Sequence, residues 1–170
     1  MQNNPQQNPE PGSPQAAGAS DAQDNNQRYW FHILAQNTPA ARHLHVARLV
    51  DKARQQGDRV CILCDNQQQA EELDDLLWTF NPETFIPHSI AHDPNTPCTD
   101  PVGLLLHPPT AADWDTIIVL SSTLPDDAHQ YRRLALVAHN DPATLNQARG
   151  HYKQLRQKGI EARVHDMRRR

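Results

Sequence analysis

Long apolar runs, an even number of cysteines and the features of a secretory leader are all missing from this sequence of 170 residues. No apolar stretch approaches the roughly 18 residues that span a bilayer, and the N-terminus lacks the basic and apolar regions of a signal peptide. We therefore expect a cytoplasmic protein with no membrane segment. The three cysteines, an odd number, favour a reduced compartment over a disulfide framework.

Glycine is scarce, with six in the whole chain. None of them forms G-x-G-x-x-G or G-x-x-x-x-G-K-[ST], the loops in which glycine lets the backbone approach a phosphate closely. The first predicted strand-to-helix turn, AQNTPA, contains no glycine. We expect no cofactor, and a nucleotide-using α/β enzyme with an unconventional phosphate loop is kept only as the alternative function.

A strong excess of either charge is also absent. The chain carries −4, and residues 1–27 hold three carboxylates and no Lys or Arg, which leaves −1 for residues 28–170. Broad binding to a nucleic-acid backbone needs a strongly basic surface. Direct DNA binding through the basic end RRR is therefore the least favoured function, and we expect any contact with DNA to be indirect.

Residues 1–27 are rich in Gln, Asn and Pro and contain no aromatic residue and no Leu, Ile or Val. Such a segment cannot bury enough apolar surface to offset the entropy lost on ordering. We predict a disordered tail over 1–27 and a single domain over 28–170.

Within that domain, strand-like and helix-like segments alternate. The predicted strands are 28–35, 58–65, 102–106, 115–122, 133–139 and 160–167, and the predicted helices are 38–57, 66–80 and 141–159. The proline-rich segment 81–101 is predicted to be a connection. This order favours a three-layer α/β/α fold, Rossmann-like but without a glycine loop, around a mostly parallel sheet, with a mixed sheet left open.

No catalytic residue and no metal ligand set emerges from the motifs. Cys61 and Cys64 form C-x-x-C, but residues three apart in a strand point to opposite faces, which favours buried thiols. Ser121, Ser122 and Thr123 follow a predicted strand, yet they lack a G-x-S-x-G elbow and an identifiable base. A capped strand end explains them better than a nucleophile does.

Scarce large side chains gather in EELDDLLWTFNPETFIPHSIA, residues 71–91. Helical spacing places Trp78 away from the inward face. That face is formed by Leu73, Leu76, Leu77 and Phe80. Beyond the helix, Phe85 and Ile86 are consecutive and point in opposite directions, and Pro87 stiffens the exit. Two interpretations stand: either the rings seal the sheet edge, or they form an exposed patch with the composition of an interface hot spot.

The last predicted helix carries an apolar stripe of Leu145, Ala148, Tyr152 and Leu155. A cationic band lies beside it, formed by Arg149, Lys153 and Arg156. This combination suits an acidic peptide that also carries a hydrophobic anchor. The alternative is a solvated helix face whose cations extend past the apolar edge into water.

These motifs resemble a known family. GDRVCILCDNQQQAEELDDLLWTFNPETFIPHSIA is similar to the LD-x-x-LW…FIPH segment of the chi subunit of bacterial DNA polymerase III. DTIIVLSS and ARGHYKQLRQKG resemble later parts of that family in the same order. The resemblance implies a noncatalytic α/β subunit that pairs with the psi subunit, which tethers it to the clamp loader. It also implies binding to the acidic, aromatic-ended C-terminal tail of the single-stranded-DNA-binding protein.

The resemblance also assigns residues. Trp78, Phe85 and Pro87 match the hydrophobic patch that contacts psi or a competing repair helicase. Arg149, Tyr152 and Lys153 match the pocket for the acidic tail, and Arg156 extends the same band. The sequence departs from the family pattern at Leu145 and Gly150, where more basic residues are usual.

Overall fold

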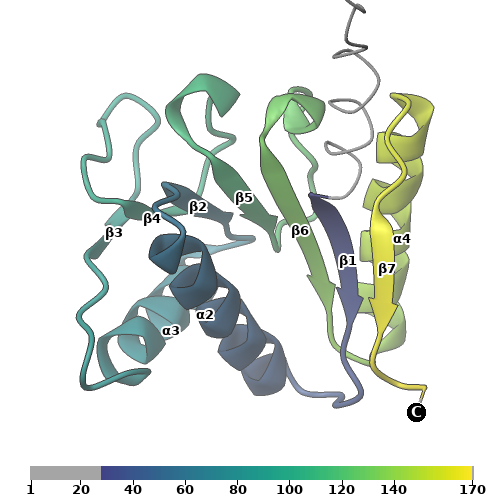
Figure 1. The fold of residues 1–170 in the computed structure, drawn as a ribbon, viewed down its shortest axis with the longest axis horizontal. Coiled ribbons are helices and arrows are strands. Elements are labelled where there is room, and N and C mark those ends of the chain that lie inside the picture. Colours follow the sequence, from purple (N-terminus) through teal and green to yellow (C-terminus); the bar gives the residue numbers. More distant parts are fainter. Residues whose placement is uncertain (1–27, 170) are drawn as a thin grey trace, which may run out of the picture.

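The computed structural model describes residues 28–169, so the predicted disordered tail 1–27 lies outside the described residues (Figure 1). One seven-stranded sheet has the order β3-β4-β2-β5-β6-β1-β7. Every strand pairing is parallel, so the sheet is wholly parallel rather than mixed. The strands are β1 (Tyr29–Ile33), β2 (Val60–Leu63), β3 (His88–Ala91), β4 (Val102–Leu105), β5 (Thr116–Val119), β6 (Arg133–Ala138) and β7 (Arg163–Asp166).

Three α-helices begin where the sequence predicts. They are α2 (Pro39–Gln55), α3 (Gln67–Thr79) and α4 (Pro142–Gln157). The side-chain oxygen of each N-cap accepts a backbone N–H bond, at 3.2, 2.9 and 3.1 Å for Thr38, Asn66 and Asp141. Gly57 and Gly159 follow the ends of α2 and α4 with φ of 84° and 85°. A side chain disfavours that left-handed conformation, so glycine ends both helices.

The helices cover both faces of the sheet and give three layers, as predicted (Figure 1). Side chains of α2 and α3 share one core cluster, and side chains of α4 belong to the other. Cys61 packs in the α4 cluster and Cys64 in the α2–α3 cluster. This confirms that the two thiols lie on opposite faces of the sheet.

Strand β3 lies inside the predicted connection 81–101, which was therefore partly wrong. It pairs only with β4, at one edge of the sheet. Prolines are tolerated next to an edge strand, because one side of such a strand has no ladder to lose. Because Pro87 and Pro94 lie close to this four-residue strand, the sequence pattern predicted a connection instead of a strand.

The buried face of α2 includes two polar side chains. Leu44 and Leu49 are only half-buried, whereas Arg42 and His43 are buried. The Arg42 guanidinium donates hydrogen bonds to the backbone carbonyls of Val137 and Leu120, at 2.8 and 3.4 Å. Carbonyl oxygens at the ends of two strands thus replace water around this cation.

Candidate functional site

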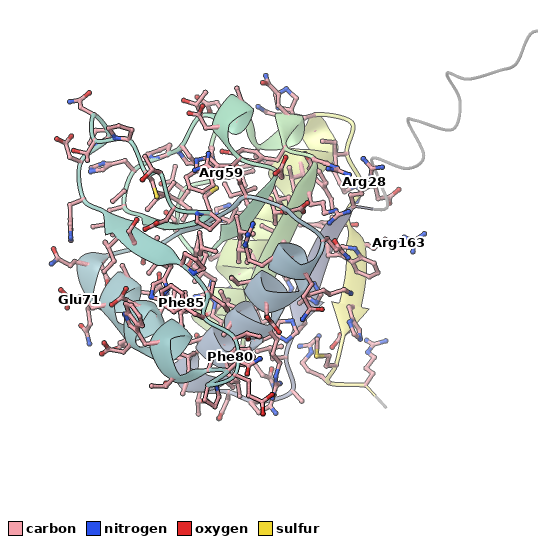
Figure 2. All side chains as sticks on the ribbon, turned by 60° about the vertical axis from the view of Figure 1, so that its left-hand side comes forward. Arg28, Arg59, Glu71, Phe80, Phe85 and Arg163 are labelled. Carbon is pink, nitrogen blue, oxygen red and sulfur yellow. The ribbon has the colours of Figure 1, made fainter. Side chains whose placement is uncertain are left out.

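The first candidate surface, here called the aromatic patch, consists of Trp78, Phe85 and Pro87. Trp78 is 56% exposed and Phe85 is 66% exposed, and their ring centroids lie 5.3 Å apart. Figure 2 shows Phe85 beside α3 at the surface of the molecule. Ile86, only 4% exposed, packs into the core instead. The interpretation in which these rings seal the sheet edge is therefore wrong; Ile86 performs that packing.

The aromatic patch rests on a buried histidine. The Trp78 ring meets His88 edge-on, with centroids 4.9 Å apart. Nδ1 of His88 donates to the Ile86 carbonyl at 2.6 Å, and Nε2 lies 3.1 Å from an Asp74 carboxylate oxygen. The geometry of this second contact is not that of a hydrogen bond, so Nε2 has no hydrogen-bond partner among residues 28–169. These contacts hold the end of α3 against β3 and fix the position of Trp78.

The second candidate surface, here called the basic band, consists of Arg149, Tyr152, Lys153 and Arg156 on α4. At about 100° per residue, all four lie within roughly one third of the helix circumference. The three cations are exposed. Within residues 28–169, none of these cations has an ion pair or a side-chain hydrogen bond. Their charges are therefore free to meet an anionic partner.

Tyr152 links the basic band to the core. Its ring packs against Phe31 of β1, with centroids 6.0 Å apart, and it is half-buried. On the same side of α4, Leu145, Ala148 and Leu155 are all buried and anchor the helix to the sheet. The predicted apolar stripe is thus confirmed, and it places the cations along its outer border.

Val164 is an exposed apolar residue beside the basic band, and the sequence interpretation missed this residue. It is 51% exposed and lies next to Phe31 in the β1–β7 register. Residues opposite each other on neighbouring strands share a face, so Val164 lies on the same face as Phe31 and Tyr152. An isolated valine in the otherwise polar segment RVHD was the available signal.

The two surfaces lie at different edges of the sheet. The aromatic patch adjoins β3, the first strand in the order, whereas Val164 belongs to β7, the last. Figure 1 shows α3 and α4 well separated on either side of the sheet. No residue belongs to both surfaces.

The serine and cysteine residues considered as possible reactive groups have structural roles. Nε2 of His151 lies 2.9 Å from the carbonyl oxygen of Ser121, while the Ser121 hydroxyl accepts from Thr123 N–H at 3.1 Å. Burial raises the pKa of the Cys61 thiol and raises that of Cys64 to about 12. Thiols in this state are protonated and unreactive at neutral pH.

Across residues 28–169, no three His, Cys, Asp or Glu side chains are grouped so that they could hold a metal ion. Over the same residues, no helix has the length and apolar character needed to cross a bilayer.

Comparison with known proteins gives a consistent result. A sequence model of the family described as DNA polymerase III chi subunit, HolC, matches residues 27–163. The DNA polymerase III subunit chi of Pseudomonas aeruginosa is 33% identical over 135 residues, which cover 79% of this chain and 93% of that protein. The DNA polymerase III subunit chi of Haemophilus influenzae is 30% identical over 130 residues, covering 76% of this chain and 90% of that protein. The chain therefore belongs to the DNA polymerase III chi subunit family.

Proposed function

We propose that this chain is a noncatalytic accessory subunit of the DNA polymerase III holoenzyme, acting in the cytoplasm as a bridge between two proteins. One partner is a psi subunit, which connects it to the clamp loader. The other is the acidic C-terminal tail of the single-stranded-DNA-binding protein. The observation that carries the proposal is the pair of surfaces described above, one aromatic and one cationic, at different edges of the same sheet.

The aromatic patch is assigned to psi. Large rings exposed side by side are typical of interface hot spots, because they bury much apolar area with few rotatable bonds. Trp78 and Phe85 are two of the three large hydrophobic residues found exposed among residues 28–169. A repair helicase that uses the same rings would exclude psi, so the two partners would bind alternately.

The basic band is assigned to the acidic tail. Arg149 supplies a planar group that can hold a carboxylate through two hydrogen bonds, and Lys153 and Arg156 add charge along the same side. The third exposed large hydrophobic residue, Val164, lies on the same face as Tyr152. A C-terminal aromatic ring placed against these two residues would leave its carboxylate near the cations.

A peptide titration tests this assignment. An acidic peptide with a C-terminal Phe is titrated against the wild-type chain, Arg149→Ala and Arg48→Ala, the last being an exposed arginine on α2. A charge-assisted hydrogen bond contributes about 1.5–3 kcal/mol, so Arg149→Ala should weaken binding at least about tenfold and Arg48→Ala should not. Equal affinities for all three chains would contradict the assignment.

A further inference from the structure

A third surface lies on the α2 side of the sheet, apart from both candidate surfaces. It is a groove of about 400 Å³ between α2 and strands β1, β5, β6 and β7. Helix α2 packs on β2 and β6, which leaves the outer strands β1 and β7 partly open on this face. The groove, here called the α2–β1 groove, is lined among others by Trp30, His32, Lys52 and His165.

Three rings and a guanidinium lie together on the floor of this groove. Trp30 pairs with Arg163 and His32 pairs with His165 in the β1–β7 register, so all four side chains share one face. The Trp30 and His32 rings stack with centroids 5.9 Å apart and an interplanar angle of 27°. The Arg163 guanidinium carbon lies 5.6 Å from the Trp30 ring centroid, and the His165 ring lies 5.8 Å from His32.

The charged lining of the groove is entirely cationic. Arg28, Lys52 and Arg133 line it, and none of its lining residues is Asp or Glu. Arg133 is already paired with the buried Asp58 at 2.9 Å. Within residues 28–169, Arg28, Lys52 and Arg163 have no ion pair. Figure 2 shows Arg28 and Arg163 on the same side of the molecule, away from Phe85. Positive charge is thus concentrated here, although the chain as a whole carries −4.

We propose that the α2–β1 groove binds single-stranded nucleic acid directly. Phosphates lie near Arg28, Lys52 and Arg163, and a base packs on the ring array of Trp30 and His32. A cationic groove with rings on an open sheet face is the usual means of binding single strands without sequence preference. The ring-covered floor favours bases, because every base has an apolar face that packs on aromatic rings. This inference goes beyond the proposed bridging function and requires neither the aromatic patch nor the basic band.

Fluorescence anisotropy of a labelled 15-nucleotide oligothymidine, with the full chain as titrant, tests the proposal. Three phosphate contacts predict a slope of about −2 for log Kobs against log salt, since each contact on a single strand contributes about −0.7. Lys52→Glu or Arg163→Glu should weaken binding at least about tenfold at low salt and make the slope shallower. Trp30→Ala should weaken it about tenfold, with Trp30→Phe retaining much of the affinity because it keeps a ring.

The matched control is Lys158→Glu, the same charge reversal as Lys52→Glu at an exposed lysine that ends α4 on the other face of the sheet, and it should leave oligothymidine binding unchanged. Thermal melting of each variant shows that it is folded; Lys52 and Arg163 are exposed, so their reversal should leave the melting temperature nearly unchanged. The proposal is overturned if the oligonucleotide does not bind at low salt or if the groove variants bind it like wild type. It is equally overturned if those variants lose affinity for an acidic peptide and not for the oligonucleotide.

Discussion

Phe85 and Ile86 are adjacent in the chain, yet the side chain of Phe85 is 66% exposed and that of Ile86 is 4% exposed. The segment before β3 turns one side chain to solvent and the next into the α2–α3 core. Because Ile86 fills the core at this point, core packing does not require an aromatic ring at residue 85. Substitutions at this pair can therefore test the proposed binding role of Phe85 separately from stability.

Phe85→Ala should abolish co-purification with a psi-like partner while the chain remains folded. An exposed ring contributes little to the folded state, so the free energy of unfolding should change by less than about 0.5 kcal/mol. Affinity for the acidic peptide should be unaffected, because the basic band lies elsewhere. Loss of both partners together with a collapsed melting curve would show that Phe85 belongs to the core.

Ile86→Ala is the matched control and should give the reverse result. Truncating a buried isoleucine costs about 2–5 kcal/mol of stability. Urea denaturation should show this loss, whereas psi binding by the folded fraction should remain, since Ile86 does not contribute to the patch surface. Strong loss of psi binding at unchanged stability would place the binding surface at Ile86.

Two glycine-to-alanine substitutions should change the stability of the chain in opposite directions. A Cβ at Gly150, exposed on α4, would meet no atom within 4 Å, so Gly150→Ala should stabilise the chain by up to about 1 kcal/mol through helix propensity. A Cβ at Gly103 on β4 would lie 2.7 Å from the Trp114 ring, so Gly103→Ala should destabilise by about 1–3 kcal/mol. Chemical denaturation of both variants checks this, and equal effects would contradict the packing around Trp114.

Local patterns in the sequence were enough to predict much of the fold. The caps Thr38, Asn66 and Asp141 and the glycines after α2 and α4 are short-range signals, and they located the helices closely. Strand order could not be predicted, because it depends on contacts between segments far apart in the chain. Burial of Arg42 could not be predicted for the same reason: its acceptors are carbonyls of β6 and the end of β5.

The candidate surfaces were predicted in part. Helical spacing separated Trp78 from the inward face of α3, and it placed the cations of the basic band beside Tyr152. Val164 was missed because its relation to Phe31 and Tyr152 arises only when β7 pairs with β1. The α2–β1 groove was missed likewise, since it unites residues of five separate elements.

Five partly or fully buried histidines predict an acid-sensitive stability. Burial, the largest cause, lowers the pKa of His32 to about 4 and lowers the pKa of His43, His45, His139 and His151 below 6.5. The unfolded chain then binds protons more readily, so the free energy of unfolding is highest above pH 6.5 and falls as the pH drops from 6.5 towards 4. Each pKa unit of depression corresponds to at most about 1.4 kcal/mol per histidine.

Urea unfolding at pH 7.5, 6.5, 5.5 and 5.0 measures this dependence, and His32→Gln should reduce its slope because one titrating group is removed. A free energy of unfolding that stays constant or rises on acidification through this range would contradict neutral burial of these rings.

The three cysteines should differ sharply in reactivity. Cys61 and Cys64 are buried with raised thiol pKa values, whereas Cys98 is only half-buried. Iodoacetamide at pH 7.5 should modify Cys98 first under native conditions, and all three only after unfolding. Peptide mass mapping identifies the labelled cysteines. Rapid labelling of Cys61 or Cys64 in the native chain would contradict their burial and support a reactive C-x-x-C pair.

Simultaneous occupancy of both partner surfaces tests the bridging account most directly. The acidic peptide is titrated by anisotropy into the chain alone and into its complex with a psi subunit. Because the aromatic patch and the basic band share no residue and adjoin different edges of the sheet, the two dissociation constants should agree within about twofold, a coupling free energy of about 0.4 kcal/mol. Displacement of psi by the peptide, or a tenfold weaker dissociation constant in the complex, would show that the surfaces are not independent and that the chain cannot bridge two partners.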